Sequence, residues 1–289
     1  MDKFERVANT VFVPLVARIN ISKKFPDLFC DKKALELEKY LPKDATKGSF
    51  EYSNLASVAR YYHMDAMASD FITRNAPCNV IYLGSGLESA YFRLREALGL
   101  GKAKFYEIDL PEVIKTRRSV YGENQDEKLV SGDMFTLDWV EKIEDKDLPT
   151  ILLASGVFQY FKEKEILRFI ENLSLSFPGQ ELVFDATNTK GLKFTNWFIK
   201  RTGNADAIMT FAVDDSVEFA NKAHADLLEE RLFFSEIREI LGRSANFISR
   251  LLMKNADRGK KTIILRLCLS NLSTNKQRKG QVKLCPDYH

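Results

Sequence analysis

Residues 80–89, VIYLGSGLES, indicate the fold of this chain most clearly. The apolar first half of this stretch is typical of a strand buried in a parallel sheet, because helices cover both faces of such a strand. The two glycines that follow, Gly84 and Gly86, permit a tight turn and bring the backbone close to a ligand. The N-terminus of the next helix favours negative charge at the same place. The stretch therefore predicts a strand, a ligand-binding loop and a helix in succession.

The same alternation continues along the chain on both sides of this stretch. Helical spacing of apolar residues predicts helices over residues 88–98 and 162–177, each ended by glycine or proline. Strands are expected at residues 79–83, 103–109, 129–130, 150–154, 181–186, 227–234 and 262–269. Repeated strand–helix alternation predicts an α/β fold: a Rossmann-like, mostly parallel seven-stranded sheet with helices on both faces.

The 289 residues fit one decorated α/β domain. We expect a single domain over residues 1–289 rather than two. Its parts are a helical N-terminal cover (1–75), a cofactor-binding core (76–186), a lid insertion (187–226), closing strands and a helix (227–272), and a basic tail (273–289).

Charge and composition exclude several classes of function. The net charge of +3 combines an acidic body with a basic stretch from Lys254 onward, and that stretch lacks interleaved aromatic residues, so no nucleic-acid partner is expected. No apolar run approaches the ~20 residues that span a bilayer, so no membrane partner is expected either. The scattered cysteines and histidines predict reduced thiols and no metal site. We expect a cytoplasmic protein.

The common glycine-loop families fit poorly. Ser89 occupies the third position of the nicotinamide fingerprint GxGxxG, where glycine or alanine is usual. No Gly-Lys-Ser/Thr follows, as a phosphate-binding P-loop requires. Leu83 stands where the hydrolase elbow GxSxG needs its first glycine.

Acidic residues after the second and third strands indicate a nucleoside instead. Asp109 ends the second strand, 23 residues after Gly86, where a carboxylate can accept both ribose hydroxyls. Asp133 can accept from an exocyclic amine, and Met134 can pack on a purine face. Each acid alone could equally be a solvated side chain at a strand end. Together they predict an adenosine pocket.

Five segments then carry a family resemblance. They are VIYLGSGLESAYFRL (80–94), FYEIDLPEVIKTRR (105–118), SGDMFTLDW (131–139), ASGVFQYF (154–161) and FPGQELVFDA (177–186). In order and spacing they resemble class I S-adenosylmethionine-dependent methyltransferases, and more closely the polyketide-type O-methyltransferase branch of the leucine carboxyl methyltransferase superfamily. The resemblance runs from about Thr10 to Ala186.

The resemblance implies S-adenosylmethionine as cofactor and a role for each matching residue. Gly84 and Gly86 would lie at its methionine part, and Arg60 would pair with its carboxylate, a task that suits a guanidinium. Lys23 is a weaker match for a second basic contact. The ribose and adenine contacts implied by the family fall on Asp109, and on Asp133 with Met134.

One position departs from the family pattern. The family typically has glutamate after the fourth strand, near the cofactor's amino group, where this chain has Ser155. A serine can hydrogen-bond there but cannot supply the charge.

The resemblance implies an O-methyltransferase acting on a hydroxyl or carboxylate of a small, polyketide-like metabolite. The alternatives are a protein C-terminal carboxyl methyltransferase and a non-catalytic S-adenosylmethionine-binding module. No catalytic residue is assigned. Tyr160 and His63 are conceivable bases, but the simpler interpretations are core packing for Tyr160 and a surface helix position for His63. Aromatic residues of the expected lid either close an acceptor pocket or pack in the core. These are Trp197, Phe198 and Phe211.

Overall fold

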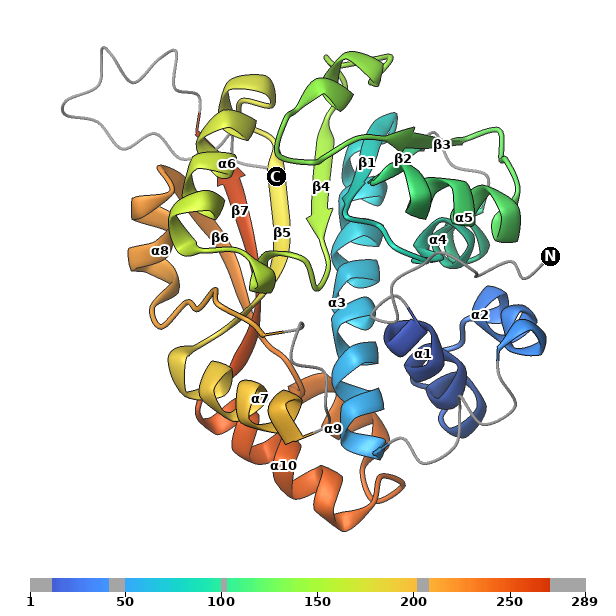
Figure 1. Cartoon of the computed structure of the whole chain (residues 1–289), viewed down its shortest axis with the longest axis vertical. Coiled ribbons are helices and arrows are strands. Elements are labelled where there is room, and N and C mark those ends of the chain that lie inside the picture. The colour runs from blue at the N-terminus through green and yellow to red at the C-terminus, as the bar shows by residue number, and fades with distance from the viewer. Residues whose placement is uncertain (1–11, 42–49, 100–102, 202–207, 271–289) are drawn as a thin grey trace.

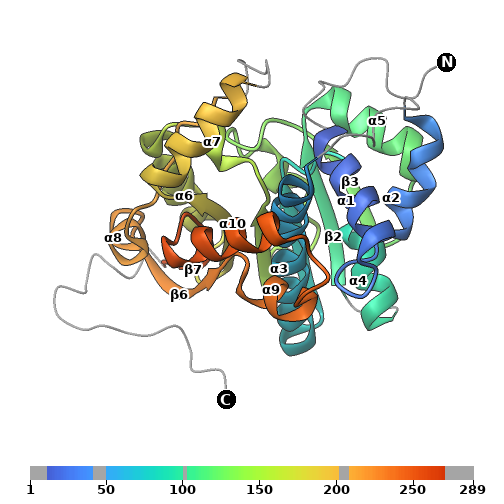
Figure 2. The ribbon, with the colours of Figure 1, turned by 90° about the horizontal axis from the view of Figure 1, so that it is seen from below.

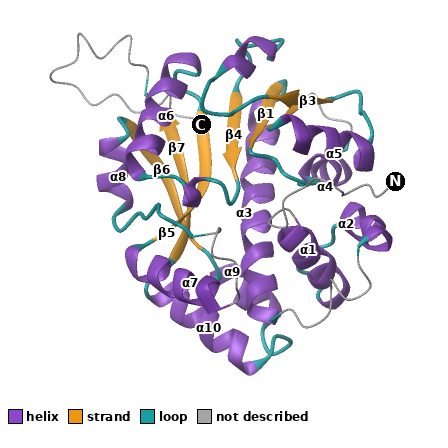
Figure 3. Ribbon diagram, viewed as in Figure 1, coloured by secondary structure: helices purple, strands orange, loops and turns teal. Residues whose placement is uncertain are grey.

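The computed structural model describes residues 12–41, 50–99, 103–201 and 208–270. Its seven strands form one sheet in the order β3-β2-β1-β4-β5-β7-β6 (Figures 1 and 3). The strands are β1 (Cys78–Leu83), β2 (Ala103–Asp109), β3 (Glu127–Ser131), β4 (Thr150–Ala154), β5 (Glu181–Thr187), β6 (Ala225–Leu232) and β7 (Thr262–Leu269). Strands β1 to β5 pair in parallel, and β7 runs antiparallel to both β5 and β6. The Rossmann-like, mostly parallel sheet is confirmed.

Ten α-helices surround this sheet in the described part of the chain. They are α1 (Phe12–Lys24), α2 (Lys32–Leu37), α3 (Glu51–Asn75), α4 (Ala90–Leu98), α5 (Pro111–Tyr121), α6 (Glu163–Ser176), α7 (Thr189–Arg201), α8 (Ser216–Lys222), α9 (Ser235–Leu241) and α10 (Phe247–Arg258). Short 3₁₀ turns follow α2 (Glu38–Tyr40), β3 (Asp138–Lys142) and β4 (Phe158–Tyr160).

Local sequence explains where several helices begin. The Asp31 carboxylate accepts a hydrogen bond from the Ala34 backbone N–H (2.9 Å) and caps α2. Asn246 does the same for α10 by accepting from the Ser249 N–H (2.7 Å). Pro111 starts α5, where its fixed φ suits the helix and its missing N–H costs nothing.

The core lies on both faces of the sheet, because successive residues of a strand point to opposite sides. In β1, Val80 and Tyr82 pack with α3, α4, α9 and α10, whereas Ile81 and Leu83 pack with α6 and α8. All four side chains are almost completely buried. A third, smaller cluster joins α1 and α2 to Leu87 of the glycine loop, so the N-terminal helices cover the loop directly.

Some boundaries differ from the expected ones. Strand β3 begins at Glu127, two residues early, because the ion pair of Glu127 with Arg117 (3.1 Å) lets a buried carboxylate sit in an edge strand. Two helices, α9 and α10, stand between β6 and β7 where one was expected; Gly242, with φ of +50°, ends the first. Residues 273–289, the expected basic tail, lie outside the described residues.

Two further expectations concern cysteines and membranes. The expectation of reduced thiols is wrong for Cys268 in β7, which is disulfide-bonded, whereas Cys30 and Cys78 are free. None of the helices in the described part of the chain has the length and apolar character that crossing a bilayer requires.

Candidate functional site

The glycine loop follows β1 at the carboxyl edge of the parallel strands. Gly84 has φ of +62°, and a Cβ there would lie 2.7 Å from Val157 Cγ2, so neither its conformation nor its surroundings tolerate a side chain. Gly86, with φ of +53°, also takes the left-handed conformation, but the space beside it is open. The loop is thus pressed against the segment after β4 at one glycine and leaves room for a ligand at the other.

Asp109 lies directly beside this loop at the end of β2. Its Oδ2 accepts a hydrogen bond from the Gly86 N–H and its Oδ1 accepts from the Leu110 N–H, both at 2.7 Å. Burial raises the pKa of the Asp109 carboxyl, although these two hydrogen bonds oppose the shift. The structure therefore brings Gly86 and Asp109 into direct contact.

The end of β3 continues the same edge. The Gly132 N–H donates to the Asp109 carbonyl oxygen (2.9 Å), which places the two strand ends side by side. Asp133 is exposed and accepts from the Phe135 N–H (2.9 Å). Met134 is buried instead: its side chain belongs to the core cluster that holds Trp139, whose Nε1 donates to the Met134 carbonyl (3.0 Å).

Arg60 reaches the edge from the middle of α3. Its Nε forms an ion pair with Asp185 Oδ2 (3.0 Å) at the end of β5, and Asp185 Oδ1 accepts from the Gly156 N–H (2.6 Å). A Cβ at Gly156 would lie 2.5 Å from Arg60 Nη1, so the guanidinium rests against bare backbone. Burial lowers the pKa of Arg60, but Asp185, Tyr61 and Tyr160 together raise it above its ordinary value. Arg60 is thus a fixed cation at this edge.

Sequence reasoning did not assign Asp185 to the site. Its signal was present, because Asp185 stands near the end of an apolar strand as Asp109 does. Ser155 precedes the glycine that Asp185 holds, and the buried Ser155 Oγ has no hydrogen-bond partner among the described residues. A buried hydroxyl of this kind is normally satisfied, so Ser155 is available to a ligand or a water. Asp185, on the neighbouring strand, places a carboxylate beside the residue that follows Ser155.

A buried arginine supports the loop from below. Arg117 Nη1 donates to the carbonyl oxygens of Gly86 (3.1 Å) and Glu88 (2.7 Å). Its Nη2 forms ion pairs with Glu107 (3.2 Å) and Glu127 (3.1 Å). Burial raises the pKa of Glu107 to about 8 even though Arg117 lowers it. The loop carbonyls are therefore fixed by a charge network with no exposed member.

A second buried network ties the N-terminal helices to the same loop. Arg18 pairs with Asp31 (2.6 Å), and Arg93 reaches the same carboxylate (2.9 Å). The Ser89 hydroxyl donates to Asp31 (2.6 Å), and Arg18 also bonds the Leu87 carbonyl oxygen. Ser89, the residue that departs from the nicotinamide fingerprint, is therefore a junction between α1, α2 and the loop.

Neither conceivable base has the expected environment. Tyr160 is 42% exposed rather than packed in the core, and it lies near Arg60. His63 is completely buried rather than on a surface helix; its Nε2 is 3.1 Å from the Phe233 carbonyl oxygen, and burial lowers its pKa. Both simpler interpretations are wrong, because the faces of α3 and of the turn after β4 depend on tertiary packing.

The remaining sequence candidates are spread out. Lys23 pairs with Glu38 at the surface. Phe211 is buried and packs edge-on against Phe158 and Phe219, so it belongs to the core. Trp197 is 51% exposed, and the side chain of Phe198 lies outside the described residues.

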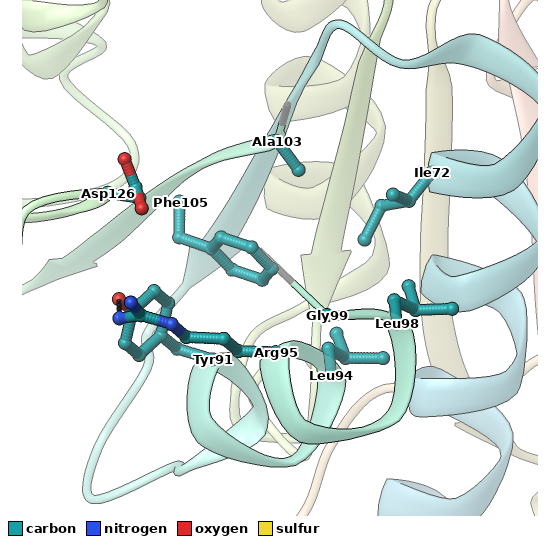
Figure 4. Close-up of a pocket in the computed structure, with 9 residues that line it drawn as sticks. All are labelled: Ile72, Tyr91, Leu94, Arg95, Leu98, Gly99, Ala103, Phe105 and Asp126. Atoms are coloured by element: carbon teal, nitrogen blue, oxygen red, sulfur yellow. Dashed lines mark hydrogen bonds between the residues drawn. The ribbon is translucent and has the colours of Figure 1, made fainter. Parts of the chain in front are cut away.

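Two hollows lie away from these residues. One of about 20 Å³ lies between α3, α4 and β2, lined among others by Ile72, Tyr91 and Phe105, and has room for a single water (Figure 4). The other, about 340 Å³, runs along the edge strand β3. None of the sequence-predicted site residues lines either hollow. Among the described residues, no group of three or more His, Cys, Asp or Glu side chains is arranged to hold a metal.

Comparisons with known proteins show the family and the fold of this chain. The family model "Leucine carboxyl methyltransferase" matches residues 13–174, more than half of the chain. The tetracenomycin polyketide synthesis O-methyltransferase TcmP of Streptomyces glaucescens is 22% identical over 200 residues, which cover 68% of this chain and 73% of that protein.

Solved structures share the fold. One is a DUF574 family protein from Streptomyces avermitilis, at a TM-score of 0.55 and 11% identity, covering 87% of this chain and 96% of that one. A putative methyltransferase from Thermobifida fusca has a TM-score of 0.53 at 13% identity, covering 88% and 94%.

Proposed function

The chain belongs to the leucine carboxyl methyltransferase family, and on that premise we propose that it methylates an oxygen of a small, polyketide-like metabolite. It is an S-adenosylmethionine-dependent methyltransferase. The proposal concerns the acceptor and the residues that bind each partner. The single observation that carries the residue assignment is the gathering of Asp109, Asp133 and the Arg60–Asp185 pair along one edge of the sheet.

Two groups of residues fit the two parts of the cofactor, adenosine and methionine. Asp109 and Asp133 offer acceptors to the ribose hydroxyls and to the adenine amine. Arg60 offers a guanidinium to the cofactor carboxylate, and Asp185, with Ser155 beside it, offers acceptors to the cofactor ammonium. Gly84 and Gly86 have no side chain, so the cofactor can cross the loop backbone between its adenosine and methionine parts. Because Met134 is buried in the core, we propose that it supports this adenine subsite from behind.

The chain's contribution to methyl transfer is positioning. S-adenosylmethionine supplies a methyl group on a sulfonium, so no covalent nucleophile is needed from the protein. A carboxylate acceptor is already ionised, whereas a hydroxyl needs help with its proton. The exposed Tyr160 phenol beside Arg60 is the group that we propose hydrogen-bonds the acceptor oxygen. Excluding water from the reacting pair falls to α7, which we propose as the lid within the expected insertion 187–226, because Phe211 and α8 of that insertion pack in the core.

The acceptor class rests on the relative and on the exposed aromatic side chains. TcmP is named for polyketide O-methylation. Phe194 and Trp197 of α7 stack at 6.3 Å and stay half-exposed at the end of the molecule where the site lies, which suits a flat, apolar acceptor (Figure 1).

The test is to measure S-adenosylhomocysteine formation by the full chain with two acceptors. A polyhydroxylated aromatic carboxylic acid should be methylated on oxygen, as mass spectrometry of the product would show. A peptide ending in leucine should not be. Methylation of the peptide carboxylate in place of the aromatic acid would contradict the proposal and favour a protein carboxyl methyltransferase.

A further inference from the structure

Helix α10 exposes an apolar face to solvent. Phe247, Ile248 and Leu251 are 71%, 58% and 57% exposed, and their spacing places them on one side of the helix. The opposite side, with Ser249 and Met253, is buried. Single exposed apolar residues are common, but a contiguous group of large ones marks an interaction surface.

The same helix exposes only positive charge. Arg250, Lys254 and Arg258 are basic, and the only acid within α10, Asp257, is buried and pairs with Arg238 (3.3 Å). The preceding helix α9 carries acids, so the basic character belongs to α10 itself.

Helix α7 repeats this composition at the same end of the molecule, as the view from below shows (Figure 2). Its sequence, TKGLKFTNWFIKR, contains no acid. Phe194 and Trp197 are 45% and 51% exposed, and Lys190 and Lys193 are exposed beside them.

The residue before α7 is hydrogen-bonded to the turn after α10, so the two helices meet at these ends. The Asn188 backbone N–H donates to the Lys261 carbonyl oxygen (3.1 Å), and the Asn188 side-chain amide donates to the Gly259 carbonyl oxygen (2.8 Å). The Lys261 ammonium lies 5.9 Å from the Phe194 ring centroid.

We propose that the exposed faces of α7 and α10, called here the α7–α10 surface, bind the surface of an anionic lipid bilayer. Aromatic and aliphatic side chains flanked by Lys and Arg are the composition of helices that lie in the headgroup region, where the rings enter the acyl boundary and the cations meet phosphates. A second copy of the chain is disfavoured as occupant, because two such faces would bring like charges together. The contact is peripheral. Its α10 part is independent of the methyl acceptor, whereas Phe194 and Trp197 of α7 serve it only while no acceptor covers them.

The experiment is co-sedimentation of the full chain with vesicles. Vesicles of phosphatidylcholine with about one-third phosphatidylglycerol should bind the protein, and vesicles of phosphatidylcholine alone should bind it far less. Binding should fall at 1 M salt, where the Debye length is about 3 Å. Trp197 gives a second readout: of the two tryptophans, Trp139 is 1% exposed and Trp197 is 51% exposed, so a blue shift of emission on binding reports α7.

Paired variants separate the two contributions. Phe247→Ser with Leu251→Ser should weaken binding at least about tenfold by removing inserted apolar area. Neutralising Arg250, Lys254 and Arg258 to glutamine should weaken it roughly a hundredfold, from the usual value per cation near an anionic surface. Leu175→Ser is the matched control, because Leu175 is 66% exposed on α6 and should leave binding unchanged.

Three outcomes would overturn the proposal. One is no preference for anionic vesicles, or binding that the α10 variants leave intact. Another is capture by soluble polyglutamate without vesicle binding, which would assign the surface to an acidic protein. The third is a dimer in sedimentation equilibrium that Leu251→Ser dissolves. Unchanged melting temperatures would show that each variant is folded.

Discussion

The glycine loop and helix α7 lie at the same end of the sheet but are held in different ways. The loop is fixed by buried charge: Arg117 from below, and the Arg18, Asp31 and Ser89 junction from the side. Helix α7 is attached through hydrogen bonds at its start and through the Asn196 side chain, which bonds the Met209 backbone, and it leaves Phe194 and Trp197 half-exposed. The methyl donor has the same shape in every turnover and benefits from a preorganised site, whereas acceptors of different shape need a segment that can adjust.

The largest expected effect comes from removing the support under the loop. Arg117→Met would leave the buried Glu127 carboxylate without its cation and the carbonyl oxygens of the glycine loop without their donor, and should lower the free energy of unfolding by about 3–5 kcal/mol. The neighbouring Arg118→Met is the control: Arg118 is exposed and paired with Glu123, so it should cost about 0–1 kcal/mol. Urea unfolding of both variants measures the difference. Equal free energies of unfolding for the two would show that the buried Arg117 stabilises the fold no more than the exposed Arg118 does.

The next effect concerns cofactor affinity. Arg60→Ala should weaken S-adenosylmethionine binding roughly tenfold to a hundredfold, the range for one charged hydrogen-bonding partner. Arg74→Ala, on the same helix but near Asp70 and Glu181, should leave binding unchanged. Isothermal calorimetry distinguishes them, and a normal dissociation constant for Arg60→Ala would exclude Arg60 from the site.

A pH dependence should follow from the buried carboxyl of Glu107. Burial raises its pKa from 4.5 to about 8, so the folded chain keeps a proton that the unfolded chain releases. Stability should therefore fall as pH rises from about 4.5 to about 8, and Glu107→Gln should flatten that part of the profile. Melting temperatures across this range test it. An identical slope in the variant would show that Glu107 is ionised in the folded chain.

The smallest effect on stability is expected in α7. Trp197→Ala should change the free energy of unfolding by no more than about 0.5 kcal/mol, because the side chain is half-exposed. It should raise KM for a soluble aromatic acceptor and leave cofactor affinity as it was. A loss of cofactor affinity instead would mean that α7 contributes to the cofactor site and would contradict the proposal that α7 meets only the acceptor.

The sequence was sufficient for the sheet, and it named two residues that the structure brings into contact. Buried strands and the glycine loop follow from local patterns, and Asp109 meets Gly86 because parallel strands end at one edge. Asp185 was missed as a site residue because its pairing with Arg60 joins elements 125 residues apart, and no local pattern encodes that contact.

Burial of individual polar side chains was the least predictable property. His63 was expected on a surface helix but is buried, and Tyr160 was expected in the core but is exposed. Met134 was expected against a purine ring but packs in the core. Which face of a helix or turn is covered depends on neighbours that are distant in sequence. The expectation of no membrane partner considered only segments long enough to span a bilayer, so it did not address the peripheral contact that we propose for the α7–α10 surface.

We propose that the acids at the strand ends bind S-adenosylmethionine, and calorimetric titration of wild type and Asp109→Asn measures their contribution. We predict one binding site in the wild type and an affinity weakened roughly tenfold to a hundredfold in the variant, with no binding of a nicotinamide dinucleotide to either. Equal affinity of both proteins for S-adenosylmethionine, or binding of the nicotinamide dinucleotide alone, would contradict the account.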